Sequence, residues 1–364
     1  MDNAKIKIAI ITRSLASGGA ERSTALLSIL LSDLGFDIHI VSLLDEIEFD
    51  FKGQLFNLGI PKKMDDTKLG RFKRLLVFRR YIKENKFDWI IDNRTANSSW
   101  SDYIVSRFVV DPRKTIYVIR SFDIMRYFPK NKWIAKIIYR RSPYIVCVSE
   151  EIKKAVQTTY GYRNVIRIYN PVDTSKVVVP LGNEMEDFKY ILAYGRIEDE
   201  IKNYSLLIDA YAKSILPSVN ILLFIVGDGS DVANLKQKVA VLKLSDKIIF
   251  KSKVVNPFPI VKSAYFTVLT SHFEGFPRVI IESLALGTPV ISVDCNSGPR
   301  EIIVNEKNGL LVENHNISKL SDAMNRFVQD EELYRVCREN AQESVAHLSL
   351  DKIAAQWKEI LEKS

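Results

Sequence analysis

The chain has 364 residues and a net charge of +8, with 47% hydrophobic and 26% charged residues, as is ordinary for a soluble globular protein. This length exceeds what one hydrophobic core usually fills, so we expect two domains. The three cysteines show neither disulfide nor zinc spacing, which favours a reducing, cytoplasmic compartment, and no apolar run is long enough to predict a membrane span.

The first half of the chain alternates strand-like and helix-like segments. The apolar stretch at 5–12 is predicted as a strand and not as a signal peptide, because it turns polar after Thr12 and shows no cleavage site. A glycine-containing loop then leads into an apolar-periodic helix that ends near Gly35. Further strands are expected at 37–43, 87–92, 115–120, 144–149 and 165–170.

The same pattern starts again after a polar joining stretch near 171–188. Continuous aliphatic runs separated by helices are typical of parallel strands that are buried on both faces. The chain is therefore predicted to form two doubly wound α/β domains, residues 1–170 and 171–349. The second is expected to have strands at 189–195, 221–227, 247–252, 264–271, 288–294 and 309–313, with helices at 203–215, 230–243, 257–264 and 277–286.

Two-domain α/β proteins usually bind ligands in the cleft between the domains, beyond the carboxyl ends of the strands. In the first loop of this kind, Gly18 and Gly19 precede a helix. The helix N-terminus offers free N–H groups and a partial positive charge, which suit a phosphate or a polar acceptor. The alternative is a flexible turn, and the dinucleotide-binding pattern GxGxxG is absent.

Two further loops follow strands of the second predicted domain. Arg196 and Lys202 lie in YGRIEDEIKN, and two cations there could neutralise a diphosphate, including the charge that builds on a leaving group. Ordinary surface charge is the alternative, because acidic residues surround them. Gly227 and Asp228 belong to the tight turn GDG, which by itself more often ends a strand than binds a ligand.

The most informative loop is HFEGFPRVIIE at 272–282. Pro277 suits the first position of a helix, so Glu274 is expected just before a helix N-terminus and Glu282 inside that helix, among aliphatic residues. Glu274 can accept hydrogen bonds from hydroxyl groups. A carboxylate among aliphatic residues needs hydrogen-bond partners, which ribose hydroxyls would provide. The alternative is that Glu282 is exposed on an amphipathic helix.

Together and in this order, SGGAER, GR…KN, GDG and E-x7-E resemble the retaining nucleotide-sugar glycosyltransferases of family 4, also called glycosyltransferase group 1. The resemblance covers essentially the whole chain, and E-x7-E is its most specific motif. It implies the GT-B fold, in which two Rossmann-like domains face each other across a cleft. The first would bind the acceptor and the second the donor. The helix at 350–364, with Trp357 on its apolar face, would cross back to the first domain.

The resemblance also implies roles for the matching residues. The implied catalytic residues are Arg196 and Lys202, which would bind the donor diphosphate, and Glu274, which would hold hydroxyl groups of the donor sugar. Glu282 would bind the ribose hydroxyls, and Gly19 would lie against the donor phosphates and the acceptor. The other implied donor-binding residues are Gly195, Gly227, Asp228, Gly275, Phe276 and Pro277, of which the proline has no N–H group to offer.

The sequence departs from the family pattern at two places. Many members carry a histidine after the strand that corresponds to 115–120, whereas this chain has VIRSFD there. Arg196 and Lys202 are six residues apart where five is common, so this loop is predicted to be slightly longer. The residues expected on the acceptor side are Gly18, Arg120, Ser121 and Asp123.

The resemblance implies a retaining hexosyltransferase that moves a sugar from a nucleotide-diphosphate sugar to a glycan in cell-surface polysaccharide biosynthesis. No metal or cofactor is expected, because no DxD-type site stands out and the two cations with a helix N-terminus can stabilise the departing diphosphate. One alternative is a nucleotide-sugar epimerase of the same fold, although the chain has only four histidines. The other is a catalytically inactive sugar-nucleotide-binding relative. The missing GxGxxG disfavours an NAD-dependent dehydrogenase.

The uneven charge of the chain bears on the acceptor. Residues 1–170 hold 30 Lys and Arg against 18 Asp and Glu, and the excess is concentrated at 62–86 and 125–141, where aromatic residues accompany the cations in the second stretch. This mixture suits an anionic membrane surface, although a solvated helix face is the alternative. We therefore expect a polyprenyl-linked glycan acceptor and peripheral attachment to the cytoplasmic face of the inner membrane. No nucleic-acid-binding module is recognisable, so nucleic acid is not an expected partner.

Overall fold

The computed structural model describes residues 5–16, 18–95, 99–173 and 188–363. The chain divides into two compact units, which we call unit 1 (Met1–Pro171 with Leu350–Ser364) and unit 2 (Val172–Ser349). Most of the predicted joining stretch, with Pro180 and Gly182, lies outside the described residues. Within the described ranges, no helix has the length and apolar character that crossing a membrane requires.

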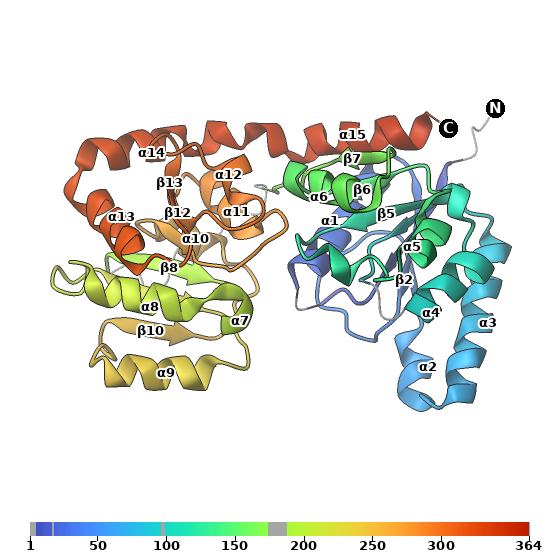
Figure 1. Ribbon diagram of the computed structural model, residues 1–364, viewed down its shortest axis with the longest axis horizontal. Helices are drawn as coiled ribbons and strands as arrows, with labels where there is room; N and C mark the ends of the chain where they lie inside the picture. Colours follow the sequence, from blue (N-terminus) through green and yellow to red (C-terminus); the bar gives the residue numbers. More distant parts are fainter. Residues whose placement is uncertain (1–4, 17, 96–98, 174–187, 364) are drawn as a thin grey trace. The chain divides into compact units, whose positions relative to one another are not determined.

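Unit 1 contains a parallel sheet with the strand order β3–β2–β1–β4–β5–β6–β7 in the described residues (Figure 1). The inner strand β1 pairs with β2 and β4, so that Ile10 lies opposite Ile40 and Ile91. The edge strand β3 was not predicted, because its residues QLFN are partly exposed and form no continuous apolar run. The strands are β1 (Lys7–Thr12), β2 (Asp37–Ser42), β3 (Gln54–Asn57), β4 (Trp89–Asp92), β5 (Thr115–Ile119), β6 (Ile145–Cys147) and β7 (Val165–Arg167).

Local hydrogen bonds fix where several helices of unit 1 begin and end. The Thr67 hydroxyl accepts from the Gly70 N–H at the start of α3, and the Ser149 hydroxyl accepts from the Ile152 N–H at the start of α6. Gly161, with φ of 70°, ends α6 in the left-handed region. The helical segments are α1 (Gly19–Asp33), α2 (Gly59–Met64), α3 (Lys68–Asn85), α4 (Ser99–Ile104), the π-helical η1 (Val105–Val109), the short 3₁₀ turns η2 (Pro112–Lys114) and η3 (Ile124–Arg126), α5 (Lys132–Tyr139) and α6 (Glu150–Tyr160).

The last helix of the chain, α15 (Leu350–Glu362), completes unit 1. It packs against α1, and the indole N–H of Trp89 on β4 donates a hydrogen bond to the Leu361 carbonyl at 2.9 Å. Trp357 lies near Leu27 of α1 around a small internal cavity. The buried residues of α15 are Ile353, Ala354, Trp357, Ile360 and Leu361.

Unit 1 contains a buried histidine whose pKa is shifted. His39 on β2 is 1% exposed, and its Nδ1 lies 2.7 Å from the Tyr81 hydroxyl. Burial lowers the pKa of His39, and the nearby Asp37 only partly opposes this effect. Because the folded pKa lies below the unfolded value of about 6.5, the unfolded chain binds more protons as the pH falls through 6.5. The contribution of His39 to the free energy of unfolding therefore falls as the pH falls through 6.5.

We expect the free energy of unfolding of unit 1 to fall between pH 7 and pH 5, by at most about 1.4 kcal/mol per pH unit from His39. Urea titrations of the wild type and of His39→Gln at several pH values measure this, and the variant should show a shallower dependence on pH. His347→Gln is the matched control, because His347 is exposed. Equal slopes for the wild type and His39→Gln would contradict the prediction.

Unit 2 repeats the parallel arrangement, with the strand order β10–β9–β8–β11–β12–β13 in the described residues. Its strands are β8 (Tyr190–Tyr194), β9 (Leu222–Val226), β10 (Ile248–Lys251), β11 (Thr267–Leu269), β12 (Val290–Val293) and β13 (Gly309–Val312). Its helices are α7 (Asp199–Lys202), α8 (Tyr204–Lys213), α9 (Val232–Val241), α10 (Phe258–Ser263), α11 (Arg278–Ala285), α12 (Pro299–Ile302), α13 (Ile317–Gln329), α14 (Glu331–Ser344) and the 3₁₀ turn η5 (Ala346–Leu348).

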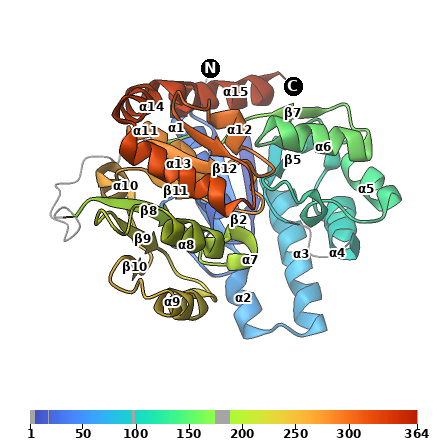
Figure 2. The same cartoon turned by 60° about the vertical axis from the view of Figure 1, so that its left-hand side comes forward.

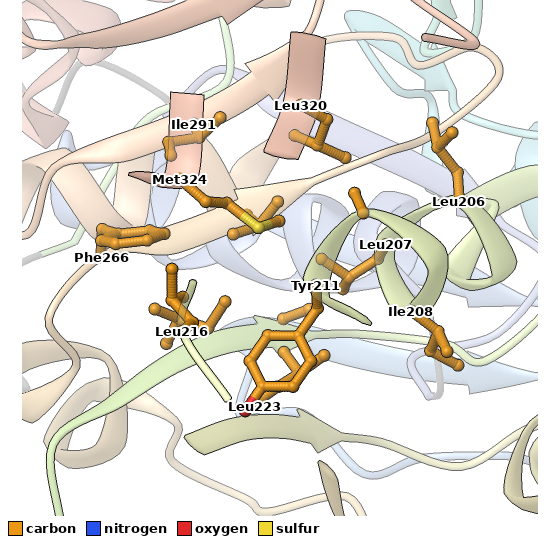
Figure 3. Close-up of a cluster of buried hydrophobic side chains, with 14 of the residues drawn as sticks. Leu206, Leu207, Ile208, Tyr211, Leu216, Leu223, Phe266, Ile291, Leu320 and Met324 are labelled. Carbon is orange, nitrogen blue, oxygen red and sulfur yellow. The ribbon is translucent and has the colours of Figure 1, made fainter. Parts of the chain in front are cut away.

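Both faces of the unit 2 sheet are buried, as the continuous aliphatic runs predicted. On β8, Ile191 and Ala193 face one core cluster, while Tyr190 and Leu192 face the other. The larger cluster joins the sheet to α8 and α13, which lie side by side (Figure 2). In Figure 3, the side chains of Leu207 and Tyr211 from α8 belong to the same cluster as those of Leu320 and Met324 from α13. This core holds the strand ends, and therefore the loops that follow them, in fixed positions.

Candidate active site

The loops after β8 and β9 are built on each other through their backbones. The Gly195 N–H donates to the Val226 carbonyl and the Ile197 N–H donates to the Asp228 carbonyl, both at 2.9 Å. A Cβ atom at Gly227 would lie 1.8 Å from the Gly195 carbonyl oxygen, so this position admits no side chain. The turn GDG therefore supports the loop that carries Arg196.

A lysine and a carboxylate meet at the carboxyl edge of the unit 2 sheet. The Lys202 ammonium lies 2.6 Å from Glu274 Oε1, which also accepts a hydrogen bond from the Ser271 hydroxyl at 2.7 Å. Their side chains are 25% and 13% exposed, so both can still be reached by a ligand. The Thr270 hydroxyl and the His272 N–H donate to the Lys202 and Ile201 carbonyls, which fixes α7 against the loop after β11.

The loop around Glu274 is tied to the loop after β12. The Glu274 N–H donates to the Asn296 carbonyl at 2.8 Å, and the Ser297 hydroxyl donates to the Gly275 carbonyl at 2.8 Å. Phe276 is buried, and Pro277 precedes α11 as its N-cap residue. The predicted residues Glu274, Gly275, Phe276 and Pro277 thus form one braced turn before the helix.

Glu282 lies inside α11 and is 1% exposed, so the alternative of an exposed position on an amphipathic helix is wrong. Its Oε1 accepts hydrogen bonds from Arg278 Nε at 3.1 Å and Nη2 at 2.9 Å. Its Oε2 accepts from the Tyr194 hydroxyl at 3.1 Å. The carboxylate therefore has partners from within the chain, and its burial does not by itself require a ribose.

The two predicted cations do not share a partner. Arg196, whose side chain is 48% exposed, pairs with Glu198 at 3.3 Å, whereas Lys202 pairs with Glu274. Lys202 is the last residue of the single turn of α7, which ends at Asn203 in the left-handed region. The Asn203 side chain in turn caps the start of α8.

One histidine, His272, precedes Glu274 by two residues in the chain. The His272 ring stacks on that of His315, with centroids 4.9 Å apart and planes at 26°. Burial lowers the pKa of His272, and the charge of His315 lowers it further. Both effects disfavour the charged imidazolium form of His272, which makes it poorly suited to act as a general acid.

The predicted acceptor-side residues lie in two loops of unit 1. Gly18 is the N-cap of α1, so Gly19 begins that helix. Arg120, after β5, donates hydrogen bonds to the Asn93 and Asn170 side chains, which ties the ends of three strands together. The Ser121 hydroxyl accepts from the Asp123 N–H, and Asp123 pairs with Arg126.

Several polar residues of these sites were not predicted. Ser271, Tyr194 and Arg278 contact the two glutamates, and only Arg278 could have been found from spacing, because it lies four residues before Glu282 on a helix. In unit 1, Asp92 at the end of β4 forms a buried two-point ion pair with Arg94.

No group of three or more His, Cys, Asp or Glu side chains in the described parts of the chain could hold a metal ion.

Two models of known protein families match this chain. Residues 17–176 match the model of glycosyltransferase family 4, and residues 182–344 match that of glycosyl transferases group 1. The chain belongs to these glycosyltransferases. The two matches fall on unit 1 and unit 2, so each half of the enzyme is represented by its own compact unit.

Relatives and solved structures agree with this assignment. The N-acetylgalactosamine-N,N'-diacetylbacillosaminyl-diphospho-undecaprenol 4-alpha-N-acetylgalactosaminyltransferase of Campylobacter jejuni is 27% identical over 96% of this chain and 97% of its own length. The lipopolysaccharide 1,6-galactosyltransferase of Escherichia coli is 33% identical over 45% of this chain and 46% of its own. The Anabaena HepE structure with UDP-glucose, 19% identical, covers 98% of this glycosyltransferase and 100% of HepE with a TM-score of 0.79. The fold is GT-B.

Proposed function

We propose that this glycosyltransferase moves a sugar from a nucleotide-diphosphate sugar to a lipid-linked glycan acceptor and retains the anomeric configuration. The observation that carries the proposal is the Lys202–Glu274 ion pair, which lies at the N-terminal end of the helix that holds Glu282. A cation for a diphosphate and a carboxylate for sugar hydroxyls thus occur together. The Campylobacter relative, matched over nearly its whole length, is named for a diphospho-undecaprenol acceptor, which supports a lipid-linked glycan here.

In the proposed reaction, the acceptor hydroxyl oxygen attacks the anomeric carbon as the bond from that carbon to the donor phosphate oxygen breaks. Attack occurs on the same face from which the phosphate leaves, so the configuration is kept. The proton of the acceptor hydroxyl passes to the departing phosphate oxygen. Lys202 and Arg196 stabilise the charge that builds on the diphosphate, and Glu274 holds the donor sugar. This scheme needs no metal ion or cofactor.

The nucleotide is tested by thermal unfolding with UDP, GDP and ADP, each with and without magnesium. A ligand that binds only the folded protein stabilises it by about 2.7 kcal/mol at a hundredfold excess over Kd. We expect one nucleoside diphosphate to raise Tm by the same amount with and without magnesium. Stabilisation by none of the three would overturn the nucleotide-sugar donor.

Retention is tested separately, with the matching nucleotide sugar and a polyprenyl-diphosphate-linked glycan. The proton NMR spectrum of the product reports the configuration at its new anomeric carbon. We expect the configuration of the donor. An inverted product would overturn the retaining mechanism but not the transferase.

The lipid-linked acceptor is supported by an outward apolar stripe on α3. Leu69, Phe72 and Leu76 follow the helical spacing i, i+3, i+7 and are 60%, 57% and 46% exposed, whereas Phe78 and Ile82 on the other face are buried. Exposed cations flank the stripe, namely Lys73, Arg79, Arg80 and Lys83. An apolar stripe among cations fits the surface of an anionic bilayer, where the side chains enter the headgroup region.

We expect the triple variant L69S/F72S/L76S to bind vesicles containing phosphatidylglycerol at least about tenfold more weakly than the wild type, because the apolar area that enters the bilayer is lost. Co-sedimentation measures the bound fraction, and added salt should weaken the binding of the wild type. Val241→Ser in unit 2 is the matched control, because Val241 is also exposed. Absence of binding by the wild type would remove the membrane surface from the proposal.

A further inference from the structure

The two oxygens of Glu282 have different partners. Oε1 accepts from both Nε and Nη2 of Arg278, at 3.1 and 2.9 Å, and the Arg278 side chain is only 9% exposed. Arg278 lies one helical turn before Glu282 on the same helix. Two hydrogen bonds from a rigid guanidinium to one oxygen fix the position of Oε1, and a partner on Oε2 then fixes the plane of the carboxylate.

The partner of Oε2 has a second acceptor within reach. The Tyr194 hydroxyl lies 3.1 Å from Glu282 Oε2 and 3.3 Å from the Val279 carbonyl oxygen. A tyrosine hydroxyl has one proton and can donate it to only one of these oxygens at a time. If a ligand hydroxyl donates to Oε2, Tyr194 can turn its proton to Val279, and neither group is left without a partner.

Tyr194 directly precedes the loop that carries Arg196. It is the last residue of β8, and Gly195 and Arg196 follow it directly. The residue that covers Oε2 is therefore joined to the loop that carries one of the proposed diphosphate-binding cations. In a nucleotide the ribose is only a few bonds from the diphosphate. A diphosphate bound at that loop would therefore place the ribose in the neighbourhood of Tyr194.

We propose that Arg278 and Tyr194 give the two oxygens of Glu282 separate tasks in recognising the nucleotide ribose. Arg278 is a positioning residue that holds Oε1 and orients the carboxylate. Tyr194 holds Oε2 until a ribose hydroxyl replaces it as the donor. This inference rests on the proposed function, because it takes a nucleotide as the ligand of unit 2.

The test compares nucleotides that differ by one hydroxyl group. Isothermal titration calorimetry on the full chain measures Kd for UDP and 2′-deoxy-UDP, and for GDP and 2′-deoxy-GDP. For the wild type we expect the ribonucleotide of the preferred base to bind at least about tenfold more tightly, as for a hydrogen bond to a charged group. In Arg278→Met this preference should fall to about threefold or less, and Arg278→Lys should restore part of it.

Tyr194→Phe gives an independent result, because in this variant the preference is not expected to fall. It removes the competing donor from Oε2, so the preference for the ribonucleotide should stay at the wild-type value or rise. The matched control is Arg326→Met, which removes another arginine of unit 2. Arg326 forms a half-exposed ion pair with Glu306, and neither residue belongs to α11 or β8. Arg326→Met should keep the wild-type preference.

The possible failures are distinguishable. If the wild type binds no nucleoside diphosphate, the proposed function fails and this inference fails with it. If the wild type binds one but does not distinguish ribose from deoxyribose, the proposed function stands and this inference is overturned. It is also overturned if Arg278→Met weakens both nucleotides equally and keeps the preference, since Arg278 would then only stabilise the fold. Should Arg278→Met not fold, a loss of the preference in Tyr194→Phe would overturn the exchange at Oε2.

Discussion

Lys202→Met should lower kcat/KM for the nucleotide-sugar donor by about 10²–10³-fold, because it removes a cation that faces the charge of the leaving diphosphate. The change also leaves the Glu274 carboxylate without the ammonium group 2.6 Å away. Initial rates of sugar transfer at varied donor concentration measure the effect, and Lys202→Arg should retain more activity than Lys202→Met.

Lys213→Met is the matched control, because Lys213 is exposed on α8 and its ammonium group donates a hydrogen bond to the Ser318 hydroxyl. It should keep the wild-type rate. Activity of Lys202→Met within threefold of the wild type, with an unchanged Tm, would show that Lys202 does not bind the donor diphosphate. A loss of activity together with unfolding would instead assign Lys202 to stability through Glu274.

A chain that ends at Ser349 should lose the stability of unit 1, because α15 supplies the apolar face that covers α1. Ile353, Trp357, Ile360 and Leu361 are buried, and their removal from the core costs about 6–10 kcal/mol. This is comparable to the whole free energy of unfolding of a typical domain, about 5–15 kcal/mol. Limited proteolysis and circular dichroism of the shortened chain should show an unfolded unit 1 beside a folded unit 2.

Trp357→Ala offers a graded version of the same experiment. It should destabilise unit 1 by about 3–5 kcal/mol, as expected when a large aromatic side chain leaves a core. The neighbouring Lys358 is exposed, so Lys358→Ala should change the free energy of unfolding by less than about 0.5 kcal/mol. A shortened chain that unfolds at the same urea concentration as the full chain would contradict this account of α15.

The strands could be predicted from the sequence where both of their faces are buried. Ile8, Ile10 and Ile11 on β1 and the aliphatic residues of β8 and β9 form continuous runs, which are typical of a buried parallel strand. β3 lies at an edge and has no such run, so periodicity could not find it. The GT-B fold itself followed from the resemblance, because the order of strands in a sheet is not written in any one strand.

The polar contacts of the site were harder to predict, because they join distant parts of the chain. Lys202 and Glu274 are 72 residues apart, and they meet only because β8 and β11 are neighbours in the sheet. Tyr194 and Glu282 are 88 residues apart, and they meet for the same reason. The motif located Glu274 and Glu282, but it could not show that Glu282 already has an arginine and a tyrosine as partners. The roles of these residues toward a ligand stay predictions.

The return of α15 to unit 1 has a consequence for synthesis of the protein. The ribosome makes unit 1 in two parts, because α15 is made only after about 180 residues of unit 2. At about 5–20 residues per second, unit 1 waits roughly 10–40 s for this helix, with part of the apolar surface of α1 uncovered. Unit 2, although it begins later, is complete first. In the living cell, chaperones that shield apolar surface should therefore engage the nascent chain through its N-terminal half.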